Sequence, residues 1–152
     1  MPLRPGETLL HYRLVEQIGE GGMGLVWRAE DTTLDRQVAI KILPERFAAD
    51  PSRLSRFERE AKALAALNDP GIASIYSVHL DAEVPFLAME LVEGEALRSR
   101  IGPAGMPLDE LLELAISLAD AVAAAHAAGI VHRDLKPDNV MRTARRRVKV
   151  LD

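Results

Sequence analysis

Three residues with complementary chemistry lie close together in the segment HRDLKPDN, residues 132–139. Asp134 supplies a carboxylate, Lys136 a cation and Asn139 a side-chain amide. Transfer of a phosphoryl group to a hydroxyl uses these three groups. The carboxylate accepts the hydroxyl proton, the cation steadies the moving phosphoryl group, and the amide oxygen holds Mg²⁺. The residue types and their spacing therefore predict a phosphoryl-transfer loop, with Asp134 as its base.

A glycine-rich run is the first element that could hold a nucleotide for such a loop. It contains Gly19, Gly21, Gly22 and Gly24, and it follows a short strand pattern at 12–18. This spacing is weak evidence alone, because dinucleotide-binding folds use it where a strand leads into a helix. Here residues 25–29, with Val26 among them, again have a strand pattern. We expect a turn at 19–24 between two strands, whose N–H groups cover phosphates; a plain glycine turn is the alternative.

The segment Val38-Ala39-Ile40-Lys41-Ile42-Leu43 predicts a strand, because β-branched residues are enriched in it. Strand alternation places Ala39 and Lys41 on one face and the residues between them on the other. A small alanine beside a cation suits a surface that receives a flat base and then phosphates. A solvent-facing lysine is the alternative.

Helical periodicity begins at Asp50-Pro51, an N-cap residue followed by proline at the first helical position. Strands are expected at about 72–79 and 85–91. A long helix is expected at about 108–128, with Gly129 as its C-terminal cap and a hairpin after residue 139. One apolar stripe along this helix comprises Leu111, Leu112, Ala115, Leu118, Ala119, Val122 and His126, the last as a satisfied core histidine. A full helical lobe is expected to cover this stripe, and without that lobe the stripe is expected to be exposed.

The chain resembles a bacterial protein serine/threonine kinase of the eukaryotic-like type. Residues 132–139 match H-R-D-x-x-x-x-N at every fixed position, and the glycine run and the strand lysine precede it in the family's order. The resemblance implies an α+β, two-lobe protein-kinase-like fold. It comprises an N-terminal extension at 1–11 and a kinase domain at 12–152. The antiparallel-sheet N-lobe covers about 12–92 with one main helix, and the start of the helical C-lobe covers about 93–152.

The resemblance also implies roles for residues that would otherwise be taken as core or surface. Lys41 would hold the α- and β-phosphates of ATP and pair with Glu60, for which a solvated helix glutamate is the alternative. Lys136 would contact the γ-phosphate, and Asn139 and Asp152 would bind Mg²⁺. His132 is expected to pack rather than to act as a base. The remaining nucleotide-binding residues implied are Ile18, Gly19, Gly21, Gly22, Gly24, Val26, Ala39, Met89, Glu90, Val92 and Met141.

Composition restricts the partners of this chain. The net charge is −4, so no global basic footprint for nucleic acid is expected, and the absence of cysteine excludes disulfides and thiolate metal sites. Apolar stretches are interrupted by charge before the roughly 18 residues that a membrane helix needs, so a cytoplasmic segment is expected. The basic cluster Arg142, Arg145, Arg146, Arg147 and Lys149 predicts a solvated hairpin turn rather than a binding surface.

The expected partners are ATP, Mg²⁺ and a protein substrate with serine or threonine. Two alternatives remain at this point: an ATP-binding but inactive fragment, and a phosphotransferase for small molecules. Leu135-Lys136-Pro137 and the glycine run favour the protein kinase. Family domains continue beyond the metal-binding Asp, which corresponds to Asp152, so these residues alone are expected to be poorly active and poorly stable.

Overall fold

The computed structural model describes residues 3–21 and 24–151 of the chain. The chain divides into two compact units. The first consists of Met1–Ala65 and Ile75–Leu91, and the second of Ala66–Ser74 and Val92–Asp152. Each unit has its own cluster of buried apolar side chains, so each unit is described by itself. None of the helices in the described residues is both long and apolar enough to span a membrane.

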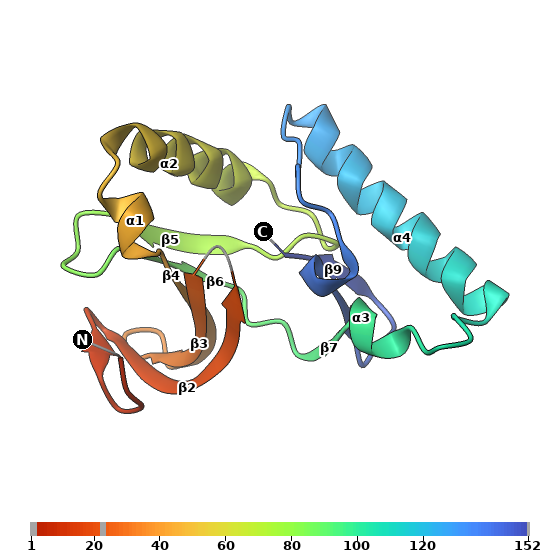
Figure 1. The fold of residues 1–152 in the computed structure, drawn as a ribbon, viewed down its shortest axis with the longest axis horizontal. Helices are drawn as coiled ribbons and strands as arrows, with labels where there is room; N and C mark the ends of the chain where they lie inside the picture. Colours follow the sequence, from red (N-terminus) through yellow and green to blue (C-terminus); the bar gives the residue numbers. More distant parts are fainter. Residues whose placement is uncertain (1–2, 22–23, 152) are drawn as a thin grey trace. The chain divides into compact units, whose positions relative to one another are not determined.

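A curled antiparallel sheet forms most of the first unit (Figure 1). Its strands are β1 (Thr8–Leu9), β2 (Tyr12–Gly21), β3 (Gly24–Asp31), β4 (Arg36–Ile42), β5 (Ile75–His79) and β6 (Phe86–Met89). They are ordered β1-β2-β3-β4-β6-β5. The sheet curls enough for the Tyr12 hydroxyl on β2 to lie 2.9 Å from the Ser77 Oγ on β5.

The core of this unit lies on one face of the sheet. Its buried members are Tyr12, Leu14, Trp27, Ala29, Val38, Ile40, Ile42, Phe86 and Ala88. In β4, alternate residues belong to this cluster, whereas Ala39 and Lys41 between them do not. Ala39 and Lys41 are nevertheless buried, each with 5% of its surface exposed. The predicted division of β4 into two faces is therefore confirmed, and the solvent-facing alternative for Lys41 is wrong.

Two helices follow β4. The short helix α1 spans Glu45–Ala48, and α2 spans Pro51–Ala66. The Asp50 Oδ1 accepts hydrogen bonds from the backbone N–H groups of Ser52 and Arg53, at 3.0 and 3.2 Å. This geometry satisfies N–H groups that the first helical turn leaves unpaired. The predicted helix start at Asp50-Pro51 is therefore confirmed, whereas α1 was not expected.

Most of the glycine-rich run lies in strands rather than in a turn. Strand β2 continues through Gly19 to Gly21, and β3 begins at Gly24, which pairs with Gly21. Gly24 has φ +117°, and a Cβ there would lie 1.9 Å from the Ile42 carbonyl oxygen. The predicted hairpin is confirmed, but the expected turn at 19–24 is too long. The ladder pairing of β2 with β3 overrides the weak strand propensity of glycine.

The second unit combines a small sheet with a long helix. Strands β7 (Gly94–Ala96), β8 (Val140–Thr143) and β9 (Val148–Val150) form the sheet in that order. Helices α3 (Leu97–Arg100) and α4 (Leu108–Ala127) and the 3₁₀-helix η1 (Pro137–Asn139) accompany it. The segment 66–74 adds to this sheet through Ile72, which bridges to Val150. The expected hairpin after residue 139 is therefore present as β8 and β9.

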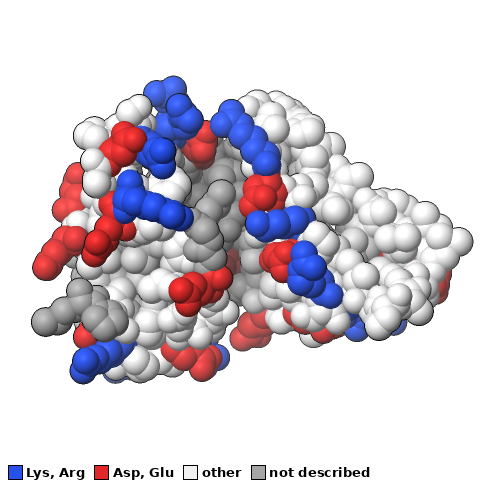
Figure 2. Space-filling model, in the orientation of Figure 1, with Lys and Arg blue, Asp and Glu red and all other residues white. Residues whose placement is uncertain are grey.

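Helix α4 packs on the core of this unit through a face other than the apolar stripe singled out in the sequence. Leu114 and Ala121 are its buried residues, and Leu118 and Ala125 pack against the same core. The predicted stripe is mostly exposed, including His126, Leu111 at 45% and Leu112 at 53%. The expectation of a core histidine at 126 is therefore wrong. Leucine and alanine occur on several sides of α4, so periodicity could not select the packed face. In the view of Figure 2, the surface over α4 carries few charged side chains.

Candidate active site

The segment 132–139 of the second unit is held by hydrogen bonds from its own histidine. The His132 Nε2 donates to the Leu151 carbonyl oxygen at 2.8 Å, and its Nδ1 accepts from the Asp134 backbone N–H at 3.1 Å. Both ring nitrogens are thus engaged in hydrogen bonds within this segment. His132 therefore connects the segment to the end of β9. This geometry supports the expected packing role and leaves no ring nitrogen for proton transfer.

The three residues predicted to carry phosphoryl transfer interact directly. The Lys136 Nζ lies 2.9 Å from the Asp134 Oδ2. The Asn139 Nδ2 donates to the Asp134 carbonyl oxygen at 2.9 Å and to its Oδ2 at 3.3 Å. The Asn139 backbone N–H also donates to the Lys136 carbonyl at 2.9 Å, which closes η1. Carboxylate, ammonium and amide are thus held within one turn of chain.

The electrostatics of this group keep Asp134 ionised. The hydrogen bond from Lys136 lowers the pKa of the Asp134 carboxyl below its ordinary value of 3.8, and Asn139 and His132 contribute in the same direction. The side chain is 42% exposed, so a hydroxyl can reach it. A carboxylate with a lowered pKa is a weak base, so such a group can orient a hydroxyl and accept its proton late in a reaction.

A further contact holds η1, and sequence spacing alone gave no indication of it. The Arg98 Nε on α3 donates to the Asp138 Oδ1 at 2.6 Å. This bond lowers the pKa of Asp138 and raises that of Arg98. Asp138 directly precedes Asn139, so α3 restrains the backbone that carries the candidate metal ligand. No local sequence pattern could reveal this pair, because 40 positions separate its members.

Five of the predicted nucleotide-binding residues share one face of the sheet in the first unit. Strand register pairs Gly19 with Val26, Val26 with Lys41, and Ala39 with Met89. Directly paired residues project to the same side of a sheet, and Ala39 and Lys41 are alternate residues of β4. This face is opposite to the one that carries the core cluster. The sheet therefore presents small, apolar and cationic groups together on one surface.

The other predicted residues are placed as follows. Glu60 is exposed on α2, and Ile18 is 47% exposed at a bulge between the register pairs of Gln17 and Gly19. Glu90 follows β6 and is half-buried, as is Val92, the first residue of the second unit's main segment. Met141 is half-buried in β8. Gly22 and Asp152 lie outside the described residues.

The donor set of the second unit suits a magnesium ion held partly by other ligands. The Asn139 Nδ2 is engaged with Asp134, which directs the amide oxygen away from that contact. Mg²⁺ prefers oxygen ligands and is commonly bound by one or two side chains together with phosphates. Among the described residues, no group of three or more histidine, cysteine, aspartate or glutamate side chains could hold a metal by itself. Asn139 therefore fits a shared metal site rather than a protein-only cage.

Comparison with known proteins identifies the class. Residues 12–152 match the model of the protein kinase domain. The chain therefore belongs to the protein kinase domain family. The expected α+β kinase-like fold is confirmed by the PknI kinase domain of Mycobacterium tuberculosis, here a double mutant, whose crystal structure is similar with a TM-score of 0.90 and 29% identity. That similarity covers 99% of this chain and 63% of the PknI chain.

Curated relatives are bacterial serine/threonine-protein kinases, as the sequence resemblance predicted. PknA of M. tuberculosis is 42% identical over 159 residues, which covers all of this chain and 37% of PknA. A probable serine/threonine-protein kinase of Streptomyces coelicolor is 44% identical over 146 residues, which covers 93% of this chain and 22% of that protein. The chain thus spans about a third or less of the length of these relatives.

Proposed function

We propose that this chain supplies the nucleotide-binding and catalytic residues of a protein kinase that transfers the γ-phosphate of ATP to serine or threonine hydroxyls. The observation that carries the proposal is the hydrogen-bonded group of Asp134, Lys136 and Asn139. It brings a carboxylate, an ammonium and an amide together within one turn of chain. ATP use would place this reaction in the cytoplasm.

In this proposal Asp134 accepts a hydrogen bond from the substrate hydroxyl and receives its proton. The hydroxyl oxygen forms a bond to the γ-phosphorus while the bond between that phosphorus and the β–γ bridging oxygen breaks, and ADP leaves. Lys136 would stabilise the negative charge of the phosphoryl group during transfer, because its ammonium lies beside Asp134. His132 holds the backbone of Asp134 and takes no proton.

The sheet face of the first unit would receive the nucleotide. Lys41 would hold the α- and β-phosphates with Glu60 as its ion-pair partner, while the backbone of the glycine run covers the phosphates. The adenine would lie against Ile18, Val26 and Ala39, and Met141 is assigned to the same base. Met89 would lie behind it, and the backbone groups of Glu90 and Val92 would meet its edge. The glycines assigned to the phosphates are Gly19, Gly21, Gly22 and Gly24.

Asn139 and Asp152 would hold the magnesium ion. When bound, this ion would neutralise charge on the β- and γ-phosphate oxygens. The contribution of this chain is to orient the amide of Asn139, whose nitrogen is committed to Asp134.

The test uses the protein with radiolabelled ATP and compares two acceptors, a serine-containing peptide and a small-molecule hydroxyl compound such as an aminoglycoside. Labelling of the peptide that disappears in Asp134→Asn supports the proposal. Labelling of the small molecule alone would show a small-molecule phosphotransferase. ATP binding without labelling of either acceptor would show an inactive binding module.

We also propose that a polypeptide limited to these 152 residues transfers little phosphate. The solved kinase domain that it resembles is longer, since the chain covers 63% of it. Groups that orient a protein substrate can lie in that further part.

A further inference from the structure

A pocket of about 380 Å³ lies in the second unit, away from the residues assigned to catalysis. It is lined by Gly94 and Glu95 of β7, Arg100 of α3, Arg142 and Thr143 of β8, and Arg146 of the following turn, with Ala144 beside them. None of these residues belongs to the segment 132–139. The sequence pattern predicted a solvated turn for the basic cluster at 142–149, but two of its arginines line this pocket.

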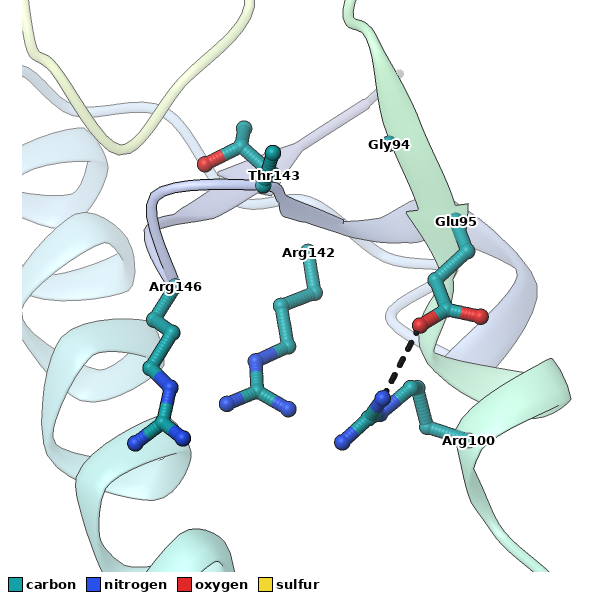
Figure 3. A pocket seen from close by; sticks show the side chains of 7 residues that line it. Gly94, Glu95, Arg100, Arg142, Thr143 and Arg146 are labelled. Carbon is teal, nitrogen blue, oxygen red and sulfur yellow. Dashed lines mark hydrogen bonds and ion pairs between the residues drawn. The ribbon is translucent and has the colours of Figure 1, made fainter.

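The three arginines of the pocket differ in how strongly ion pairs hold their side chains. Figure 3 shows the side chains of Arg146, Arg142 and Arg100 side by side, with Arg142 in the middle. The Arg142 side chain is only 10% exposed and bonds to Glu110 of α4. Arg100 bonds to the same carboxylate and, at 3.1 Å, to Glu95. Within the described residues, the Arg146 guanidinium has no ion-pair partner.

Glu110 holds the arginines in place without neutralising the pocket. The hydrogen bond from Arg100 lowers the pKa of the Glu110 carboxyl, and Arg142 acts in the same direction. Glu110 therefore remains ionised and offsets one of the two guanidinium charges that it contacts. Glu113 lines a smaller adjoining cavity beside Arg142 and Arg146.

The net charge in and around the pocket is positive even after its carboxylates are counted. Besides the three lining arginines, Arg145 and Arg147 lie exposed in the same turn. The carboxylates near them are Glu95, Glu110 and Glu113, so arginines outnumber carboxylates. A guanidinium presents its donors in a planar fork that matches a carboxylate or a phosphate. The excess positive charge of the pocket therefore suits an anionic partner.

We propose that this pocket binds an acidic peptide segment, whose carboxylate or phosphorylated side chains pair with Arg146 and with the exposed part of Arg100. Two observations and a general binding mode favour a peptide over a single free anion. The pocket has the volume of a small-ligand site, and its cations come from both a turn and a helix. Recognition of acidic or phosphorylated motifs by arginine clusters is an established binding mode.

The proposal has a structural consequence for the segment 132–139. Helix α3 carries both Arg100, which lines the pocket, and Arg98, which bonds to Asp138. A peptide at the pocket thus contacts the same helical turn that restrains η1. The pocket remains separate from the residues proposed to act on ATP.

The test measures fluorescence anisotropy of three labelled peptides with the full-length protein. One peptide alternates Glu with Ser, a second has phosphoserine in place of Glu, and a third has Gln in place of Glu. The variant Arg146→Asn removes the charge while suiting the left-handed backbone there, φ +59°. Its matched control is Arg145→Asn, which makes the same charge change at a neighbouring residue outside the pocket.

We expect one or both anionic peptides to bind, the Gln peptide not to bind, and Arg146→Asn to weaken binding about tenfold, as loss of a charge-assisted contact does. Arg145→Asn should change affinity less than threefold. Phosphorylation of a short neutral substrate should be unchanged in both variants. Equal losses in the two variants, binding of the Gln peptide, or full competition by inorganic phosphate or an oligonucleotide at equal concentration would overturn the proposal.

Discussion

The Lys136 ammonium lies 2.9 Å from the Asp134 carboxylate, and the amide of Asn139 reaches the same carboxylate oxygen at 3.3 Å. This arrangement brings three different chemical groups together in one short segment. A γ-phosphate would compete with Asp134 for Lys136, so binding of ATP and exposure of the base are expected to be linked. The pair also keeps the Asp134 carboxylate ionised.

The substitution Asp134→Asn tests the base directly. We expect phosphate transfer to fall by about 10²–10⁴-fold, the usual contribution of general acid–base catalysis, while nucleotide affinity changes little. The amide keeps the size of the side chain but cannot take a proton. Radiolabel transfer and binding of a fluorescent nucleotide are measured in parallel. Asp120→Asn, at an exposed site on α4, is the matched control, and near wild-type turnover in Asp134→Asn would remove the assigned role.

Lys41→Met tests the nucleotide face of the sheet. The methionine can occupy the buried position of Lys41, but it cannot hold phosphates. We expect kcat/KM for ATP to fall about 100-fold or more, because a misplacement of about 1 Å can have that effect. Lys62→Met, at a lysine of α2 that is 71% exposed, is the control. Equal activity of the two variants would contradict the assignment.

The pH dependence of Asp134 follows from its lowered pKa. Ionisation of Asp134 is complete above its ordinary value of 3.8 and is lost only as the pH falls through its lower folded value. Between about pH 5 and 8, where many proteins are most stable, we expect no titration of this group. Lys136→Met removes the largest cause, so the pKa of Asp134 should rise. NMR titration of the side-chain carboxyl carbon checks both statements, and an unchanged pKa in Lys136→Met would contradict the second.

Sequence alone located the groups that are close along the chain. Asp134, Lys136 and Asn139 meet because one turn contains them, and the period of a strand places Ala39 and Lys41 together. Longer-range relations could not be predicted in this way. Arg98 meets Asp138 through the packing of α3 on η1, and the packed face of α4 is ambiguous because leucine and alanine occur on several of its sides. Helices α1 and α3 are too short to show a period.

Gly24→Ala tests why glycine is required at the first residue of β3. A Cβ at this position would lie 1.9 Å from the Ile42 carbonyl oxygen, in addition to the strain of φ +117°. We expect a loss of about 1–3 kcal/mol or more in the free energy of unfolding. Gly105→Ala separates the two causes, because it has φ +85° with nothing within 4 Å. Chemical denaturation of both variants makes the comparison, and equal losses would show that backbone strain alone matters.

The last prediction concerns a polypeptide made of these 152 residues and nothing more. Helix α4 exposes Leu111, Leu112 and Ile116, the last at 63%. Exposed apolar side chains that lie together on a helix favour dye binding and association. We expect this polypeptide to bind a hydrophobic dye, and Ile116→Gln to reduce that binding while Ala123→Gln, at another exposed position of α4, does not. We also expect its phosphate transfer to be close to that of an Asp134→Asn blank, because kinase domains similar to it in structure are longer. Robust transfer above the blank would show that these 152 residues suffice for catalysis.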